Sequence, residues 1–221
     1  MPEPPFQRRL PRYPVQIPLV YWKGAEPQLL RAGWTLNLSE HGLGVELDGS
    51  LRPRLPVALR MATRYGPVVL LACVVWFGEQ QAGGGTPHGL EFQEVTLRQR
   101  EFLEGFVQTL ADRTRVGMRF PLALPAQCQL KSPAGPTLQG RTGDISRGGA
   151  MLYLPQAVPV GSVLGVTIHS AAGLADVDGV IVWVDPPTQQ AAGSPIRHGM
   201  EFILLDWGTA LMLSWVLAGG L

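Results

Sequence analysis

Two pairs of arginines stand at matching places in the 221-residue chain, each just before a run of apolar residues. Arg8 and Arg12 are four residues apart, and Arg115 and Arg119 repeat that spacing. A guanidinium presents a planar fork of N–H donors that fits phosphate oxygens and the O6/N7 edge of guanine, and it can stack on a base. Such a pair alone is usually a solvated basic loop, so its meaning depends on what accompanies it.

A short polar motif of the form [DN]-x-S-x-x-G follows each arginine pair. It occurs as Asn37-x-Ser39-x-x-Gly42 and as Asp144-x-Ser146-x-x-Gly149. In both cases the Asn or Asp stands 25 residues after the second arginine. The Asn or Asp can hydrogen-bond a base, the Ser adds a polar contact, and the Gly lets the backbone approach a ligand closely. Present twice at a fixed separation, the arginines and the motif together predict an anion-binding site.

The motifs belong to a longer internal repeat, which decides the domain organisation. The other landmarks are Arg12-Tyr-Pro and Arg119-Phe-Pro, Trp76 and Trp183, and the H-G-[LM]-E-F segments 88–92 and 198–202. The offset between copies is 107 residues up to the tryptophans and 110 at the last landmark. The sequence therefore predicts two copies of one domain, over residues 1–112 and 113–221.

Within each copy the apolar residues fall into short segments that are rich in β-branched and aromatic side chains. Examples are residues 15–22, 42–47, 57–61 and 68–77 in the first copy, and 150–154, 163–168 and 177–184 in the second. Gly, Pro or polar clusters separate these segments. Five or six strands in about 85 residues favour a closed antiparallel barrel or a sandwich, because a small open sheet would leave unpaired edges.

Each copy ends in a segment with helical periodicity. Thr96-x-x-Gln99 fits a capping box before the first helix, which is amphipathic, and Asp206 takes the N-cap position before the second. The second helix carries no charge between Trp207 and Leu217, and a helix that is apolar on all sides is buried somewhere. It could pack between the two domains, or it could contact another subunit or a protein partner. Both explanations are favoured over insertion into a membrane.

Composition argues against several classes of protein. The formal net charge is +1, and no exposed aromatics are expected to interleave with the arginines, so nucleic-acid binding is disfavoured. No apolar run approaches the length of a membrane span, and the N-terminus lacks the apolar run of a signal peptide. Two cysteines make no disulfide framework. We therefore expect a soluble, cytoplasmic protein.

The residues that could catalyse a reaction or bind a metal form no recognisable pattern. His88 and Glu91 are three residues apart, as are the corresponding residues of the second copy, but on a strand such side chains point to opposite faces. Cys73 and Cys128 do not occupy matching positions, so neither is predicted to be a nucleophile. No glycine-rich loop leads into a helix, and no C-x-x-C or H-E-x-x-H occurs. We expect no catalytic residue, no metal and no cofactor.

Taken together, the arginine pair, the [DN]-x-S-x-x-G motif, a V-x-W strand and a G-x-x-F strand resemble the PilZ domain family over essentially the whole chain. The resemblance implies an all-β fold of two tandem six-stranded antiparallel β-barrels, each followed by a C-terminal α-helix. It also implies that each copy binds the bacterial second messenger cyclic di-GMP. The implied ligand-binding residues are Arg8, Arg9, Arg12, Asn37, Ser39 and Gly42 in the first copy, and Arg113, Arg115, Arg119, Asp144, Ser146 and Gly149 in the second.

The sequence thus predicts a cyclic di-GMP receptor that transmits a signal and catalyses no reaction. Segments 6–12 and 113–119 are expected to fold over the ligand. Because segment 113–119 also links the two copies, ligand should change the arrangement of the domains and thereby signal to a partner. Glu40 stands where the second copy has Arg147, so we expect the second site to bind the anionic ligand more tightly. The alternative is a ligand-independent interaction module that docks a protein partner or a second copy through the apolar C-terminal helix.

Overall fold

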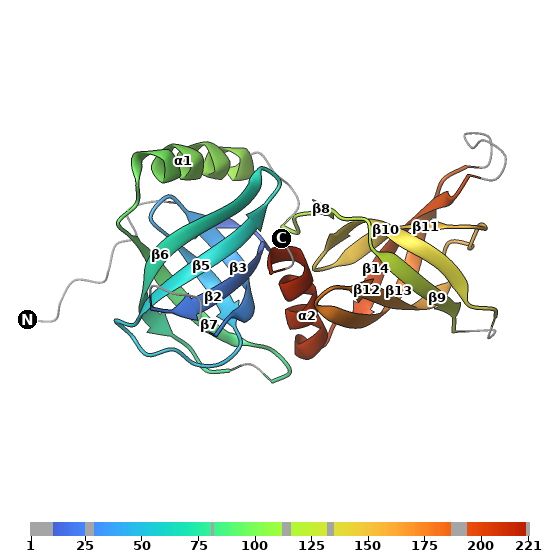
Figure 1. Cartoon of the computed structure of the whole chain (residues 1–221), viewed down its shortest axis with the longest axis horizontal. Helices are drawn as coiled ribbons and strands as arrows, with labels where there is room; N and C mark the ends of the chain where they lie inside the picture. The colour runs from blue at the N-terminus through green and yellow to red at the C-terminus, as the bar shows by residue number, and fades with distance from the viewer. Residues whose placement is uncertain are drawn as a thin grey trace, which may run out of the picture.

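The first half of the chain forms a closed barrel of six antiparallel strands, β2 to β7 (Figure 1). Their bounds are β2 (Pro18–Lys23), β3 (Arg31–Ser39), β4 (Gly42–Leu47), β5 (Pro56–Thr63), β6 (Gly66–Phe77) and β7 (Thr86–Gln93). They pair in the order β3-β2-β5-β6-β7-β4, and β4 pairs with β3 to close the barrel. The two-residue strand β1 (Tyr13–Pro14) adds to β3. The computed structural model describes residues 11–24, 29–80, 82–111, 116–131, 135–186 and 194–219.

The second half repeats this barrel strand for strand. Its elements are β8 (Phe120–Pro121), β9 (Pro125–Leu130), β10 (Leu138–Ser146), β11 (Gly149–Leu154), β12 (Val163–Ser170), β13 (Gly173–Val184) and β14 (Ile196–Leu204). The pairing order is β10-β9-β12-β13-β14-β11, with β11 closing onto β10 and β8 adding to β10. The predicted all-β fold of two six-stranded barrels is confirmed.

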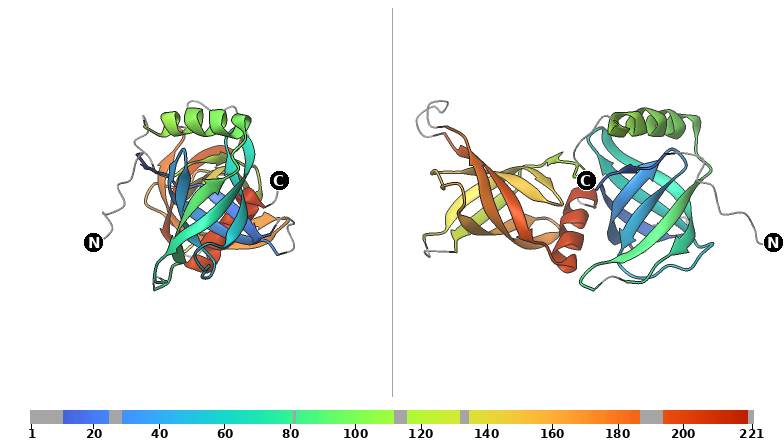
Figure 2. Two further views of the ribbon diagram at one scale, coloured as in Figure 1. Left: turned by 90° about the vertical axis from the view of Figure 1, so that its left-hand side faces the viewer. Right: turned by 180° about the vertical axis from the view of Figure 1, so that it is seen from behind.

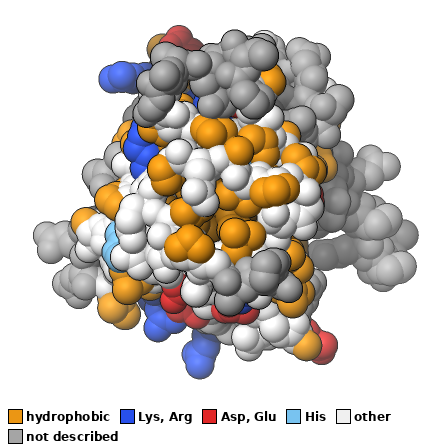
Figure 3. Space-filling model, turned by 90° about the vertical axis from the view of Figure 1, so that its right-hand side faces the viewer, with side chains coloured by type: hydrophobic (Ala, Val, Ile, Leu, Met, Phe, Trp, Pro, Cys, Tyr) orange, Lys and Arg blue, Asp and Glu red, His pale blue; other side chains and the backbone are white. Residues whose placement is uncertain are grey.

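Apolar side chains also gather on the side of the second barrel that faces away from the first (Figure 3).

A helix follows each barrel, as predicted. α1 (Leu97–Ala111) begins with the capping box, because the Gln99 backbone N–H donates to Thr96 Oγ1 at 3.3 Å and the Gln99 Oε1 accepts the Thr96 N–H at 2.8 Å. α2 (Trp207–Ala218) begins at the N-cap Asp206, whose carboxylate accepts the Thr209 N–H at 3.0 Å. Neither helix in the described part of the chain is long and apolar enough to cross a membrane.

The uncharged helix α2 lies between the two barrels (Figures 1 and 2). It packs on β2, β3 and β5 of the first barrel and on β13 of its own. The indole Nε1–H of Trp34 donates to the Ala210 carbonyl at 2.8 Å. Ser214 Oγ donates to the Gly33 carbonyl at 2.6 Å and accepts the Leu19 N–H at 3.1 Å. Of the two explanations for an apolar helix, packing between the domains is the one observed.

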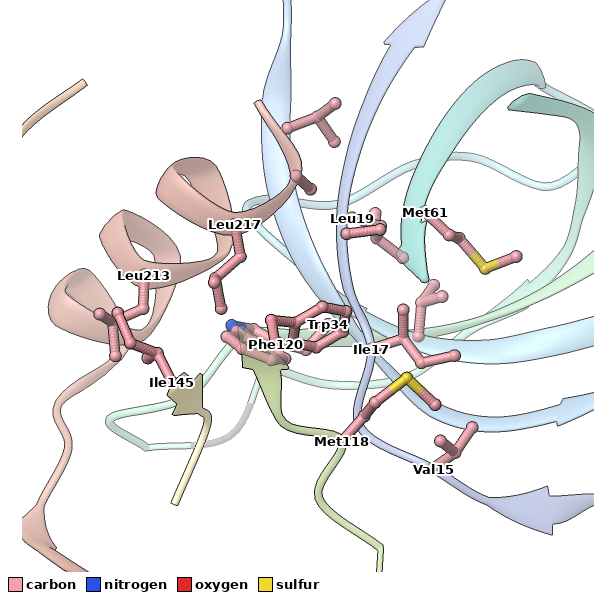
Figure 4. Packing of buried hydrophobic residues seen from close by; sticks show 14 of the residues in the cluster. Val15, Ile17, Leu19, Trp34, Met61, Met118, Phe120, Ile145, Leu213 and Leu217 are labelled. Carbon is pink, nitrogen blue, oxygen red and sulfur yellow. The ribbon is translucent and has the colours of Figure 1, made fainter. Parts of the chain in front are cut away.

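The two copies differ at the positions that receive α2. Val20 and Trp34 point outward from the first barrel and are buried, whereas their counterparts 107 residues later, Gln127 and Arg141, are exposed. Copy one therefore has an apolar outer face that only a covering element can shield from water. A single cluster of buried residues runs across both barrels and includes Ile17, Trp34, Phe120, Ile145, Leu213 and Leu217 (Figure 4).

Candidate functional site

Each [DN]-x-S-x-x-G motif forms the tight turn of a β-hairpin. Ser39 pairs with Gly42 at the end of β3, and Ser146 pairs with Gly149 at the end of β10. Ser39 Oγ donates to the Gly42 carbonyl at 2.9 Å, and Ser146 Oγ donates to the Gly149 carbonyl at 3.1 Å. Both serines are buried. Their hydroxyls therefore close the turn, which gives the motif a fixed shape.

The Asn or Asp of each motif meets the second arginine of the preceding pair. Arg119 Nη1 donates to Asp144 Oδ1 at 2.7 Å, and Arg12 Nη1 donates to Asn37 Oδ1 at 3.4 Å. Both arginines are exposed, and Asn37 and Asp144 are half-buried. The constant spacing of 25 residues follows from strand register, because Pro14 pairs with Asn37 in one barrel as Pro121 pairs with Asp144 in the other.

A β-bulge lies immediately before the Asn or Asp in both barrels. The register shifts between Thr35 and Asn37 in β3 and between Thr142 and Asp144 in β10. A bulge redirects the side chains that follow it and is common next to functional sites. At the first site the Asn37 side chain is further fixed, because its Oδ1 accepts the Gly44 N–H at 3.1 Å.

A buried threonine just before each bulge holds the arginine-bearing segment on the barrel, a role that sequence reasoning missed. Thr35 Oγ1 donates to the Val15 carbonyl at 2.5 Å and accepts the Ile17 N–H at 2.8 Å. Thr142 makes the same two contacts, with the Leu122 carbonyl and the Leu124 N–H. The signal was present in the sequence, since Thr precedes the Asn or Asp by two residues in both copies.

The motif glycines leave no room for a side chain. A Cβ at Gly42 would overlap the Leu90 carbonyl of β7, and one at Gly149 would overlap the Met200 carbonyl of β14. These glycines therefore bring β4 and β11 close to the neighbouring strand. Four other predicted site residues, Arg8, Arg9, Arg113 and Arg115, lie outside the described residues.

The family model for the PilZ domain matches residues 6–109 and again residues 112–211. The chain belongs to the PilZ domain family. No match was found among curated proteins.

Several solved PilZ structures are similar to this chain. The PilZ domain of YcgR from Escherichia coli with c-di-GMP is 14% identical, with a TM-score of 0.41, and the match covers 48% of this chain and 92% of that one. The MrkH–c-di-GMP complex of K. pneumonia is 11% identical, with a TM-score of 0.40 and coverage of 91% and 85%. PlzA of Borreliella burgdorferi in complex with c-di-GMP is 10% identical, with a TM-score of 0.37 and coverage of 92% and 88%.

The glycines of this PilZ pair allow a matched test of the turn. Gly149→Ala should lower the free energy of unfolding by about 1–3 kcal/mol, because the added methyl has to displace backbone. Gly148→Ala, one residue earlier, should change it by less than about 0.5 kcal/mol, since a Cβ there meets no atom within 4 Å. Urea unfolding measures both. Equal stability of the two variants would show that Gly149 is not sterically constrained.

The histidines and tryptophans repeated in the two PilZ barrels have structural roles. The Trp76 ring lies over Gly89 and the Trp183 ring over Gly199, and any side chain at these glycines would overlap the indole. His88 is buried, and its Nε2 accepts the Leu51 N–H at 2.9 Å while Nδ1 lies 2.8 Å from the Thr86 carbonyl. Nδ1 therefore carries the proton, and the neutral ring ties a loop to β7. Among the described residues, no group of His, Cys, Asp and Glu is arranged to hold a metal.

His88 and its counterpart His198 should make the stability of the protein depend on pH. Burial lowers the pKa of both imidazoles, and the hydrogen bond to the Thr86 or Ile196 carbonyl only partly opposes this. The unfolded chain therefore takes up protons at these histidines near pH 6.5, whereas the folded chain takes them up only at lower pH. The two neutral imidazoles contribute stability that is fully present above about pH 6.5. This contribution should be lost as the pH falls through their lowered pKa in the folded chain.

Thermal unfolding between pH 7 and 5 measures this effect. We expect the wild type to lose more stability over that range than the double variant His88→Gln/His198→Gln. His41→Gln, at an exposed position in the first motif turn, should keep the wild-type profile. Parallel profiles for wild type and the double variant would contradict the assignment.

Sequence reasoning also missed a contact that joins the second motif to the first barrel. Arg147, inside the turn between Ser146 and Gly149, forms an ion pair with Glu46 of β4. A Glu in the otherwise apolar segment G-L-G-V-E-L was a signal that β4 contains a buried charge.

Proposed function

We propose that this PilZ protein is a cyclic di-GMP receptor with one ligand site at each motif hairpin, and that it catalyses no reaction. The observation that carries the proposal is the same contact in both barrels, Arg12 at Asn37 and Arg119 at Asp144. An exposed guanidinium held beside a rigid hairpin offers charge-assisted hydrogen bonds to phosphate and to the guanine edge. Membership of the family supports the proposal.

We assign different roles to the predicted site residues. Arg12, Arg119 and the Asn or Asp would contact the ligand, because the two arginines are exposed and the Asn or Asp is half-buried at the hairpin. The serines and glycines would shape the turn through their contacts inside the barrel. The ligand contacts proposed for the first site are Arg8, Arg9, Arg12 and Asn37, and those for the second are Arg113, Arg115, Arg119 and Asp144.

We infer that ligand at the second site changes how the two barrels are arranged and thereby signals to a partner. The segment just before Arg119 is bonded to the first barrel, since the Gln16 N–H donates to the Val116 carbonyl at 2.9 Å and the Met118 N–H to the Gln16 carbonyl at 3.4 Å. Movement of Arg119 towards a ligand would therefore act on the first barrel. We take residues 1–112 and 113–221 as the two units that move.

The receptor is favoured over a ligand-independent interaction module. The face of α2 that covers Trp34 could dock a protein partner or a second copy only if the helix left the first barrel. We place the receptor in the cytoplasm, because the two cysteines are free thiols and such thiols persist in a reducing compartment.

Titration calorimetry with cyclic di-GMP tests the proposal. The wild type should bind with a dissociation constant of roughly 1 μM, and the Arg12→Ala/Arg119→Ala variant should give no heat. Cyclic di-AMP, which keeps the phosphates but lacks the guanine O6, is the specificity control. Absence of heat with the wild type would overturn the receptor and leave the interaction module.

A further inference from the structure

Glu46 of the first barrel reaches into the turn of the second proposed site. Arg147 lies within the second motif, and its Nη2 donates to Glu46 Oε2 at 2.6 Å. The two side chains are only 19% and 11% exposed. Removing one partner from a shielded ion pair leaves the other charge without compensation, which is unfavourable. The pair therefore holds the second motif turn against β4.

The surroundings fix both members of this pair. Glu46 Oε1 accepts the Gly85 N–H at 3.0 Å, so both carboxylate oxygens have a donor. The Arg147 guanidinium lies 5.7 Å from the ring centroids of Trp34 in β3 and Trp207 in α2. Side chains from three elements thus define where Arg147, and with it the turn, is placed.

The arginine-bearing side of the second site is anchored on the first barrel as well. Gln16 and Gly117 form an isolated parallel bridge, two residues before Arg119. Both parts of the second site, the arginine segment and the hairpin turn, therefore contact the first barrel. The Glu46–Arg147 pair has no mirror image in the chain, because the corresponding residues 107 positions away are Tyr153 and Glu40.

We propose that Glu46 is a positioning residue of the second cyclic di-GMP site, acting through Arg147, so that this site reaches full affinity only while the first barrel holds its turn. The inference rests on the proposed function. Without the carboxylate, Arg147 is drawn towards water and the turn samples other conformations. The ligand then binds only the fraction of molecules in which the turn is correctly placed, and its apparent affinity falls by that fraction.

The test uses the full chain carrying Arg12→Ala, so that the measured binding comes from the second site alone. Adding Glu46→Gln removes the charge but keeps an oxygen for the Gly85 N–H, and it should weaken cyclic di-GMP binding by about 5- to 100-fold. Arg147→Gln should have the same effect, and the two changes together should be no worse than either one, because the residues act as a unit. Arg147→Lys keeps the charge and should stay within about threefold of its parent.

Two controls separate positioning from loss of the fold. Asp178→Asn breaks the exposed ion pair with Lys131 in the same barrel and should leave the affinity within about twofold. In an Arg119→Ala chain, where only the first site reports, Glu46→Gln should leave the affinity unchanged. Weakening of both sites together would mean that Glu46 only supports the fold, and it would overturn the inference.

The remaining outcomes distinguish this inference from the proposed function. If the Arg12→Ala parent binds no cyclic di-GMP, the receptor function of the second site is wrong. If the parent binds and Glu46→Gln binds equally well, the receptor stands and the positioning role is wrong. If Glu46→Gln does not fold, the comparison of Arg147→Gln with Arg147→Lys decides, and equal affinities for those two would overturn the inference.

Discussion

Replacing Arg119 with alanine is expected to abolish measurable cyclic di-GMP binding at the second site and to leave the first site intact. The guanidinium is exposed at the Asp144 carboxylate, 2.7 Å away, and would donate to the ligand from there. Hydrogen bonds to charged groups contribute about 1.5–3 kcal/mol each, so loss of two of them weakens binding by roughly 100-fold to 10,000-fold. In addition, Asp144 is left as an uncompensated carboxylate facing an anionic ligand.

This second effect makes the two sites unequal in a way that can be measured. At the first site Arg12 contacts a neutral amide, Asn37, so Arg12→Ala should weaken that site less than Arg119→Ala weakens the second. Adding Asp144→Asn to Arg119→Ala should recover part of the lost affinity. Titration calorimetry should show one site of the two disappearing in Arg119→Ala. Unchanged stoichiometry and affinity in that variant would contradict the assignment of Arg119 to the ligand.

Replacing Trp34 with alanine is expected to lower the free energy of unfolding by about 3–5 kcal/mol. The Trp34 side chain is fully buried under α2, and its Nε1–H donates to the Ala210 carbonyl. The alanine would leave a cavity at the contact between the two barrels and remove that hydrogen bond. Urea unfolding gives the change directly.

The second barrel supplies the control for this variant. Arg141 occupies the position that corresponds to Trp34, is exposed, and lies over the Tyr153 ring. Arg141→Ala should therefore change the stability by less than about 0.5–1 kcal/mol. Similar losses in Trp34→Ala and Arg141→Ala would mean that α2 does not hold the barrels together in solution.

Much of this architecture could be predicted because the chain repeats itself. The sequence separation is the same from Arg12 to Asn37 as from Arg119 to Asp144. It reflects the pairing of β1 with β3 and of β8 with β10, so the spacing encodes strand register. The sequence predicts that α2 is buried, but it does not identify the first barrel as the surface that buries it. Packing on the first barrel depends on Val20 and Trp34, which stand where the second copy has polar residues. This difference becomes informative once the two copies are aligned.

The contact between Glu46 and Arg147 could not be predicted in the same way. The two residues stand 101 positions apart in different copies, and they meet only because the barrels pack in one particular arrangement. Local patterns specify strands, turns and caps, whereas the mutual placement of two barrels depends on the sum of many side-chain contacts. The roles of the motif serines and glycines likewise became apparent only with the neighbouring strands in place.

We propose that cyclic di-GMP binds at the two motif hairpins. Amide NMR spectra recorded during a titration with the ligand test it most directly, because each backbone N–H reports its own surroundings. We predict that the largest shifts fall on residues 37–42 and 144–149, and that Arg119→Ala removes those at 144–149 alone. If saturating ligand left the amide signals of both hairpins unshifted, cyclic di-GMP would not bind there.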